Sequence, residues 1–212
     1  MANKPKFTKE SIIEAGLKQL KYMGWEGLTP QKVAKRLGAS TMPIFSHFSS
    51  MEDYKKALLD RAWEIMHEYS QKKYTGDQWV DQSIGYMIFA RDHGQIFNCM
   101  HSGKPEEVQI RRHQFWVFIS KNIVDHPSFK GMDPEIAGWL RLLRTFLTYG
   151  IAVSVSSGLS PTFENEDVIK QMMSLCSELL LEGLPKKRDK LDNLLNLIPL
   201  DVRERISGIS LK

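Results

Sequence analysis

The first 50 residues carry apolar side chains three and four positions apart, the spacing of short amphipathic helices. A first helix is predicted over residues 9–23, with Thr8 as its N-cap and Gly24 as the left-handed residue that ends it. A turn over residues 24–27 separates it from the next element. The predicted buried stripe of this helix consists of Ile13, Leu17 and Leu20.

Two shorter helices follow and are joined by a tight turn. The second helix, residues 30–37, starts with Pro30 after the N-cap Thr29, where the missing N–H of proline costs nothing. Gly38 ends it, and Ser40 is the predicted cap of a third helix. The residues of the second helix expected to point inward are Val33, Ala34 and Leu37. Those expected to point outward are Gln31, Lys32, Lys35 and Arg36.

The third helix, residues 41–47, is too short to be stable alone, so neighbouring helices must hold it. Ile44 and Phe48, four positions apart, are its predicted anchors. Two helices joined by a turn, the second with a rigid outer face, are how helix-turn-helix proteins read the major groove of DNA. The residues predicted to point away from the anchors are Thr41, Met42, Pro43, Ser46 and His47.

The rest of the chain also shows helical periodicity, which predicts an all-α fold with a small head and a larger helical body. A helix-turn-helix domain is expected over residues 1–54, with its motif at 29–48, and a second domain over 55–212. A long helix at 51–74 would connect them. The further predicted helices cover residues 79–93, 95–100, 106–124, 134–157, 166–182, 187–197 and 201–206.

The distribution of charge also distinguishes the first 50 residues from the rest of the chain. Residues 1–50 contain eight lysine or arginine residues and three glutamates, a net charge of +5, whereas the remaining residues have a net charge of −1. The whole net charge of +4 therefore arises from the first quarter of the chain. A polyanion such as DNA is the expected partner, although charge alone leaves a solvated basic surface as an alternative.

Composition excludes several classes of protein. Apolar residues at 42% and charged residues at 25% are typical of a globular protein. Cys99 and Cys176 fit neither a metal spacing nor a disulfide framework, so reduced thiols are expected. No metal site, cofactor or enzymatic activity is predicted, because no ligand pair, phosphate-binding loop or nucleophile motif is visible. Without a signal peptide or a membrane-length apolar run, a cytoplasmic protein with no membrane partner is expected.

The order and spacing of the head residues resemble the DNA-binding head of the TetR family of bacterial transcriptional regulators. The stretch YMIFARDHGQIF, residues 86–97, is similar to a helix–turn–helix junction in the body of that family. The resemblance implies an all-α homodimer, most simply a ligand-responsive repressor. The matching head residues are Ile13, Ala15, Gly24, Gly27, Leu28, Thr29, Val33, Ala34, Leu37, Gly38, Ala39, Ser40, Ile44, Phe45, His47 and Phe48.

The resemblance also implies which residues contact DNA. Thr29 and the start of the second helix would meet a phosphate, and Gln31 a base or a phosphate. Met42 and Pro43 suit apolar contact with a thymine methyl group. The full implied set is Thr29, Gln31, Lys32, Ser40, Thr41, Met42, Pro43, Phe45, Ser46, His47 and Lys55.

Two positions depart from the family pattern. Phe45 stands where the family usually has a tyrosine that bonds a phosphate, and Met51 where it usually has a lysine. Each lost ionic contact would lower the salt slope of binding by about 0.9. Lys55 and Lys56 follow one turn later and are candidates to compensate, so an atypical operator or modest affinity is expected.

Two body helices, residues 134–157 and 166–182, are apolar nearly all round, which predicts that both of their sides are covered. A second copy of the chain is the expected cover, as in the four-helix dimer interface that the family implies. The alternative is the chain's own C-terminal segment, residues 187–212. In a dimer, two heads about 34–36 Å apart would read the two halves of a palindromic operator.

The body also has the large apolar side chains that line adaptable ligand cavities, so the predicted effector is a small, mainly apolar molecule. Ordinary core packing is the alternative for each of them. Arg112 and His113 are further candidates for a polar end of the site, with a surface role as the alternative. The candidate ligand-binding residues are Met87, Phe97, Met100, His101, Phe115, Trp116, Phe146 and Tyr149.

Effector binding would shift the helices that reach the head through residues 51–74 and so change the separation of the two reading helices. The chief alternative function is a protein-binding adaptor that keeps this fold but has lost specific DNA binding, which Phe45 and Met51 support. A helical enzyme is a weaker alternative, since no catalytic motif is visible.

Overall fold

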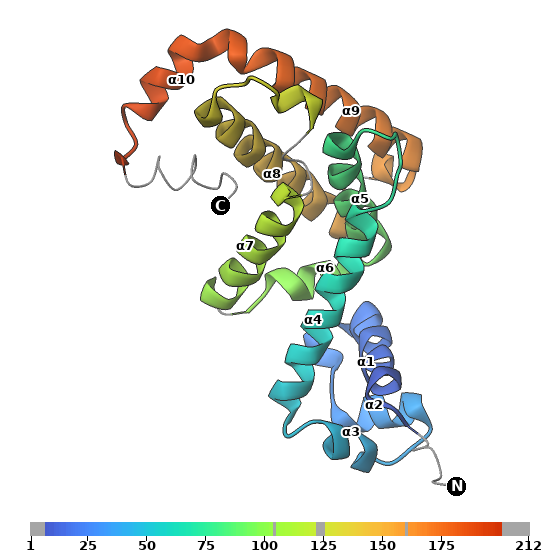
Figure 1. Ribbon diagram of the computed structural model, residues 1–212. Helices are drawn as coiled ribbons and strands as arrows, with labels where there is room; N and C mark the ends of the chain where they lie inside the picture. The colour runs from blue at the N-terminus through green and yellow to red at the C-terminus, as the bar shows by residue number, and fades with distance from the viewer. Residues whose placement is uncertain (1–6, 104, 122–125, 160, 201–212) are drawn as a thin grey trace, which may run out of the picture.

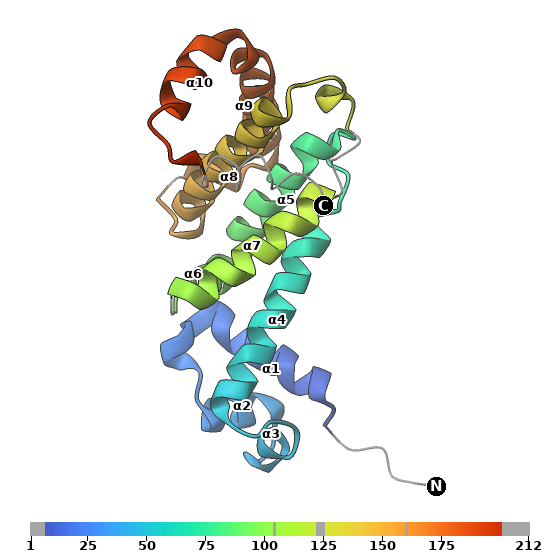
Figure 2. The ribbon, with the colours of Figure 1, turned by 60° about the vertical axis from the view of Figure 1, so that its left-hand side comes forward.

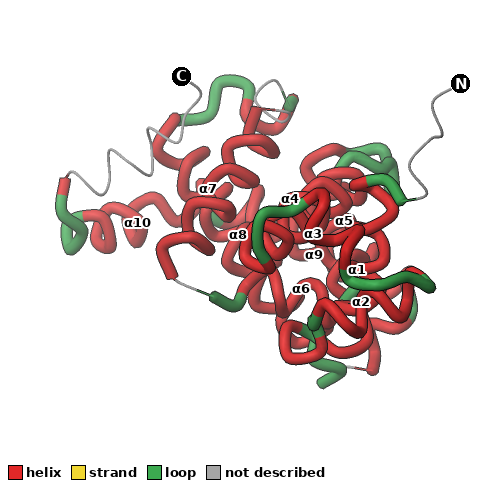
Figure 3. Tube along the Cα trace, turned by 90° about the horizontal axis from the view of Figure 1, so that it is seen from below, coloured by secondary structure: helices red, strands yellow, loops and turns green. Residues whose placement is uncertain are grey.

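The computed structural model describes residues 7–103, 105–121, 126–159 and 161–200, and within them it contains ten α-helices and no strand (Figure 3). The all-α prediction is therefore confirmed. The helices are α1 (Lys9–Met23), α2 (Pro30–Leu37), α3 (Met42–His47), α4 (Met51–Ser70), α5 (Gln78–Asp92), α6 (Gly94–His101), α7 (Pro105–Lys121), α8 (Pro134–Ser156), α9 (Glu166–Gly183) and α10 (Arg188–Leu195). No helix in the described ranges is both long and apolar enough to cross a membrane.

Figure 1 shows a head at one end of the molecule and a larger body at the other. The head consists of α1, α2 and α3, and α4 runs from it into the body, where it packs against α5. Helix α6 also reaches the head, because it packs against α1. Helices α9 and α10 form an arch over α8 at the end remote from the head (Figures 1 and 2).

The head helices begin and end where the sequence places their caps. The Oγ1 atom of Thr8 accepts the Ser11 N–H at 3.2 Å, and Gly24 ends α1 with a φ of 57°. At α2, Thr29 is the N-cap, and Gly38 ends the helix in the left-handed conformation with a φ of 65°. These local bonds satisfy backbone groups that a helix end leaves free, which is why the sequence alone located the ends.

The buried stripe of α1 differs from the prediction by one position. Ile12 is fully buried, whereas Ile13 is only partly buried. The reason is the crossing of α4, because the Tyr54 hydroxyl donates a hydrogen bond to Ile12 O at 2.6 Å. Gly16 leaves room for this contact, since a Cβ atom there would lie 2.2 Å from the Tyr54 oxygen. The other two predicted stripe residues, Leu17 and Leu20, are buried.

Helix α5 is the centre of the body. Every residue from Trp79 to Ala90 is buried, and the helix packs against α4, α8 and α9. Gly85 allows the closest of these approaches, because a Cβ atom there would lie 2.2 Å from Tyr69 O of α4. The two helices therefore cross with their backbones nearly in contact, which couples the connecting helix firmly to the body.

Helix α4 ends at Ser70 and not near Tyr74 as predicted. Asp81 explains the difference, because its carboxylate accepts the Thr75 N–H and the Thr75 hydroxyl, both at 2.7 Å, and the Gly76 N–H at 3.1 Å. These bonds hold the link between α4 and α5 as a turn. A buried carboxylate inside the next helix thus decides where the chain leaves α4.

The other predicted body helices agree with the structure within two residues at each end. The helix predicted over 201–206 and the last residues of the one predicted over 106–124 lie outside the described residues. Head and body are also joined away from α4, since the Trp25 indole N–H donates to Cys99 O of α6 at 3.2 Å. Within the body, Arg111 of α7 pairs with Asp60 of α4.

Candidate nucleic-acid interface

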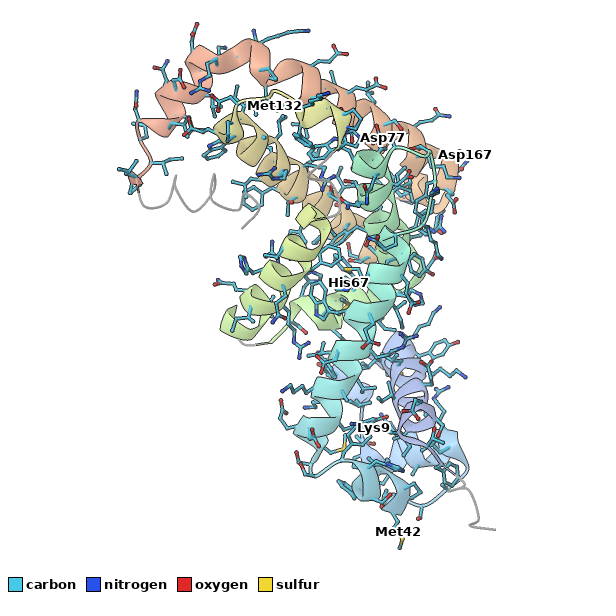
Figure 4. All side chains as sticks on the ribbon, viewed as in Figure 1. Lys9, Met42, His67, Asp77, Met132 and Asp167 are labelled. Atoms are coloured by element: carbon cyan, nitrogen blue, oxygen red, sulfur yellow. The ribbon has the colours of Figure 1, made fainter. Side chains whose placement is uncertain are left out.

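Helix α3 presents an open face at the end of the molecule remote from the body. Met42 is 75% exposed and points away from the body at the tip of the head (Figure 4), and Phe45 is 49% exposed. On the opposite face, Ile44 and Phe48 are buried, and the Phe48 ring packs against Tyr54 with ring centroids 4.8 Å apart. The helix is therefore held from behind by α4 while its outer side stays accessible.

The predicted start of α3 needs a correction, because the helix begins at Met42 and not at Thr41. Thr41 makes no side-chain cap bond, and Ser40 Oγ accepts the Met42 N–H at a long 3.4 Å. Ser40 is exposed, whereas Thr41 and Pro43 are half-buried. The exposed Ser46 hydroxyl donates to Pro43 O at 2.8 Å, which holds its side chain against the helix.

The start of α2 forms the second part of this surface. Thr29 is half-buried, and its Oγ1 atom accepts the Lys32 N–H at 3.3 Å. Gln31 and Lys32 are exposed in the first helical turn. Free N–H groups and the positive end of the helix dipole favour an anion at this position, and Lys32 adds a full positive charge. This end of α2 is therefore suited to hold a phosphate.

The segment before α1 borders the same surface. His47 Nε2 lies 3.2 Å from Phe7 O, which ties the imidazole of α3 to that segment. Lys9 at the start of α1, labelled in Figure 4, has its Nζ atom 5.3 Å from the centre of the Phe48 ring. A cation and an imidazole thus lie beside the exposed face of α3.

Lys55 lies in a different place. Its Nζ atom is 3.9 Å from Glu52 Oε2 and 6.0 Å from the centre of the Trp25 ring. Lys55 and Lys56 both line the cleft between the head and α7. The suggestion that these two lysines compensate for Met51 in contacting DNA therefore stays a prediction.

Sequence reasoning placed Arg36 on the outer face of α2, yet its guanidinium also braces the head. The Nε and Nη2 atoms of Arg36 donate to Gln19 Oε1 at 3.3 and 3.2 Å, and Gln19 Nε2 donates to Gly27 O at 3.2 Å. Gln19 is buried on α1. The signal in the sequence was a single polar residue, Gln19, on the buried side of an amphipathic helix. A search for apolar periodicity passes over such a residue.

A second candidate site is a cavity in the body that encloses about 480 Å³, including its open mouth. Helices α4, α5, α7 and α8 contribute to it. The aromatic and aliphatic lining residues are Trp63, Tyr86, Phe115, Ile119 and Tyr149. The polar lining residues are Gln82, Ser83, Arg112, Arg144, Thr145 and Thr148.

Comparison with known proteins identifies proteins of similar sequence and fold. No protein-family model matches the chain. An HTH-type transcriptional regulator of Mycobacterium tuberculosis is 34% identical over 97 residues, which cover 44% of this chain and 44% of that protein. The class A tetracycline repressor of Escherichia coli is 30% identical over 112 residues, which cover 48% and 50%. The chain therefore spans half or less of the length of these curated relatives.

Solved structures agree over a larger part of the chain. A TetR variant of Acinetobacter baumannii AYE, solved in complex with minocycline, superposes with a TM-score of 0.53 at 17% identity, covering 86% of this chain and 98% of that one. A possible TetR family regulator of Streptomyces coelicolor A3(2) gives 0.51 at 14%, covering 84% and 99%. The chain therefore has the fold of these TetR regulators. The TetR-like all-α fold that the resemblance of the head residues implied is thus confirmed.

Two of the predicted ligand-binding residues, Phe115 and Tyr149, line the cavity. Phe146 lies on the outside of α8, where its side chain is 56% exposed. The side chain of Trp116 lies outside the described part of the structure, and His113 is exposed. Three others are buried in the core and do not line the cavity: Met87, Phe97 and Met100.

His101 lies behind the cavity wall. Its Nδ1 atom is 2.8 Å from Phe97 O, and its Nε2 atom is 3.1 Å from the Tyr86 hydroxyl. Burial lowers the pKa of His101 to about 4, so the ring is neutral at pH 7. The neutral ring then donates from Nδ1 to the carbonyl and accepts the Tyr86 hydroxyl at Nε2. His101 thereby positions Tyr86, which does line the cavity.

Of the polar wall of the cavity, the sequence prediction named only Arg112 as a candidate, and it missed Arg144 above all. The available signal was a pair of charged residues, Arg141 and Arg144, inside a helix that is otherwise apolar nearly all round. Both arginines are buried. Because a buried charge is costly unless it is paired, charges in such a helix indicate a specific structural or binding role.

Proposed function

We propose that this protein is a transcriptional regulator of the TetR family that binds a two-fold symmetric operator as a homodimer and is released from it by a small effector. The observation that carries the proposal is the open face of α3, braced by Ile44 and Phe48 on the basic part of the chain. The names of its relatives, a transcriptional regulator and a tetracycline repressor, support the same kind of activity here.

In the proposed complex, α3 enters the major groove and the start of α2 meets the DNA backbone. Met42 and Pro43 contact thymine methyl groups, while Thr29 and Lys32 contact a phosphate. Phe45 has no hydroxyl and contributes an apolar contact only. The operator contacts therefore depend more on shape and on methyl groups than on ionic bonds.

Exposed apolar residues on α8 and α9 support the homodimer. Leu179 is 63% exposed, and a Cβ atom on Gly150 would meet no heavy atom within 4 Å, so no residue of the described ranges covers this side of α8. Residues 201–212, part of the alternative cover 187–212, lie outside those ranges. Helix α10 buries Leu191 and Leu195 but leaves the open side uncovered. We therefore assign the cover to a second copy and not to α10. The exposed large apolar residues are Phe146, Val153, Leu175 and Leu179.

Two connections support control of the head from the body. Trp63 of α4 lines the cavity, and Tyr54, nearer the start of the same helix, is bonded to Ile12 O of α1. Trp25 makes a second connection by donating to Cys99 O of α6. A ligand that moves α4 or α6 would move both heads of a dimer, and a coupling of about 1–3 kcal/mol would suffice to release DNA.

Hydrodynamic mass and gel retardation with the DNA upstream of the protein's own gene test this proposal. We expect a dimer, and a complex whose affinity falls as salt is raised. Lys32→Gln lowers the slope of log affinity against log salt by about 0.9, because one phosphate contact is lost. Lys130→Gln, which changes an exposed lysine of the body, is the matched control and leaves the slope unchanged. A tight monomer, or no retardation at low salt, would refute the proposal.

The protein-binding adaptor remains a second candidate, because Phe45 and Met51 lack the phosphate-binding groups usual in the family. Charge reversal at Lys32 and Lys35 distinguishes the two functions. Arg36 is left unchanged, since its bonds to Gln19 brace the head. Loss of regulation in the doubly reversed protein supports DNA binding, and full regulation by that protein supports the adaptor.

A further inference from the structure

The body cavity contains a positive charge that forms no ion pair with a described carboxylate. Arg144 is 2% exposed, and its two hydrogen bonds go to neutral oxygens, Trp79 O at 2.7 Å and Gln82 Oε1 at 3.2 Å. Its Cζ atom lies 3.8 Å from the centre of the Trp79 ring. A buried guanidinium is normally paired with an anion, because removing an unpaired charge from water is strongly unfavourable.

Arg112 brings a second cation to the same cavity. Its Cζ atom lies 4.5 Å from the centre of the Tyr149 ring, and it forms no ion pair with any residue that the structure describes. The adjacent Arg111 does not line this cavity and pairs with Asp60 of α4. Of the two neighbouring arginines, only Arg112 is therefore available to a molecule inside the cavity.

The lining of the cavity does not neutralise these charges. The described lining of the cavity contains two arginines and no acidic residue. Arg141, one turn before Arg144, is also buried, and its Nε and Nη2 atoms have no hydrogen-bond partner within the described structure. Burial and then the nearby Arg141 lower the pKa of Arg144 to about 9, against a smaller opposing effect of the Asp77 carboxylate, so Arg144 is still charged at pH 7.

The remaining lining suits a molecule with two unlike ends. Thr148 Oγ1 donates to Ser83 Oγ at 3.2 Å, which leaves the Ser83 hydroxyl hydrogen for an acceptor in the cavity. Trp63, Phe115 and other large side chains supply apolar contact area. Hydrogen-bond donors and cations thus share the cavity with aromatic surfaces, an arrangement that favours an acidic group joined to an apolar body.

We infer that the cavity binds an amphipathic organic acid, whose carboxylate pairs with Arg144 and Arg112 and whose apolar part packs against Trp63 and Phe115. The inference rests on the proposed function, in which this cavity is the effector site. It changes the effector expected from the sequence, a mainly apolar molecule, into an anion. The bonds of Arg144 to Trp79 and Gln82 are kept, because a guanidinium has further N–H donors for the carboxylate.

Calorimetric titration of the full chain with acids and their uncharged amides tests the inference. The probes are naphthalene-2-carboxylate against naphthalene-2-carboxamide, and octanoate against octanamide. We expect one acid to bind at least about tenfold more tightly than its amide, the size of effect typical of a charge-assisted hydrogen bond. Arg112→Gln should weaken binding of the acid by about tenfold and leave that of the amide unchanged.

Three further variants make the test specific. Arg111→Gln, a change of the neighbouring arginine, is the matched control and should leave the preference for the acid unchanged. Arg112→Lys keeps the positive charge and should retain most of the preference. Arg144→Gln should abolish the preference if circular dichroism shows that the variant is folded. If Arg144→Gln is unfolded, the comparison of acid binding by Arg112→Gln and Arg111→Gln decides whether the inference holds.

Equal affinity for acid and amide would overturn the inference, and so would failure of both acids to bind at millimolar concentration. An equal loss of acid binding in Arg111→Gln and Arg112→Gln would also overturn it. Gel retardation on the same samples separates the inference from the proposed function. If the amide releases DNA as readily as the acid does, the inference of an anionic effector is wrong and the proposed regulator stands. If the protein prefers the acid but does not bind DNA, the proposed regulatory function is wrong and the anion-binding cavity stands.

Discussion

In the head, the charged side chains stay at the surface and the one buried polar side chain in the described part, Gln19, is fully bonded. In the body, Arg141 and Arg144 are buried and form no ion pair with a described carboxylate, and His101 is half-buried as a neutral ring. The head thus has a self-sufficient core that holds a rigid outer surface. The core of the body contains buried positive charges that form no ion pair within the described part of the chain.

This contrast matches the two tasks that we propose. A surface that reads DNA must keep its shape before and after binding, so its interior gains from complete hydrogen bonding and dense packing. A site that responds to a small molecule must change its energy when the molecule arrives, and buried cations without counterions provide such a change. Predictions for the two regions therefore differ in kind.

The largest expected effect lies in the core of the head. Ile12→Ala should lower the free energy of unfolding by about 2–5 kcal/mol, because it opens a cavity at a fully buried site. Ile13→Ala, a change of the partly buried neighbour, should cost only about 1 kcal/mol. Urea denaturation of both variants measures the difference. Equal losses would show that the α1–α4 crossing is not centred on Ile12.

The next effect concerns His101, the half-buried neutral histidine of the body. The folded pKa of His101, about 4, lies below its usual 6.5, so the unfolded chain takes up the proton first as the pH falls. Stability from the neutral ring is therefore complete above about pH 7 and is lost as the pH falls from about 6.5 towards 4. Between about pH 7.5 and about pH 5, we expect a loss of about 2 kcal/mol.

Urea denaturation at the two pH values measures this loss in the wild-type protein and in His101→Gln. The variant should lose much less stability on acidification, because its side chain does not titrate. His113→Gln, a change of an exposed histidine on α7, is the control and should behave like the wild type. The same acid sensitivity in His101→Gln and the wild type would contradict a half-buried neutral His101.

A smaller effect is expected where the two regions meet. Trp25→Phe removes the indole N–H that donates to Cys99 O and to Ser102 Oγ, at 3.2 and 3.1 Å. A loss of about 1 kcal/mol in coupling should reduce the effector-induced change in DNA affinity by about fivefold. The ratio of DNA affinities with and without a cavity-binding acid measures it. Tyr22→Phe, an exposed site on α1, is the control, and an unchanged ratio in Trp25→Phe would argue against this connection.

The smallest expected effect is a gain at the outer surface of the head. Phe45→Tyr supplies the hydroxyl that the family usually places there, and the new bond to a phosphate should tighten DNA binding by about fivefold. The salt slope should stay the same, because a neutral hydroxyl releases no counterion. Retardation assays over a range of salt concentrations measure both the DNA affinity and its salt slope. Phe45→Leu should show no gain, and a gain in both variants would point to a cause other than the hydroxyl.

Most of the head could be predicted, because its signals are local. Thr8, Thr29 and Gly38 act on backbone groups within one helical turn, so the sequence places the helix ends closely. The bond between Gln19 and Arg36 could not be predicted, since it joins residues 17 positions apart on two helices. The body was harder, because α5 is buried on every side and so has no amphipathic face to orient it.

The sequence by itself determined the helical class and the outward position of Met42 and Phe45 on α3, because periodicity and capping depend on residues one or two turns apart. Only the tertiary structure decided that Ile12, and not Ile13, lies at the crossing with α4. Only it brought Arg112 of α7 and Arg144 of α8 into one cavity. Both results depend on how distant helices cross, which is set by the packing of many side chains at once.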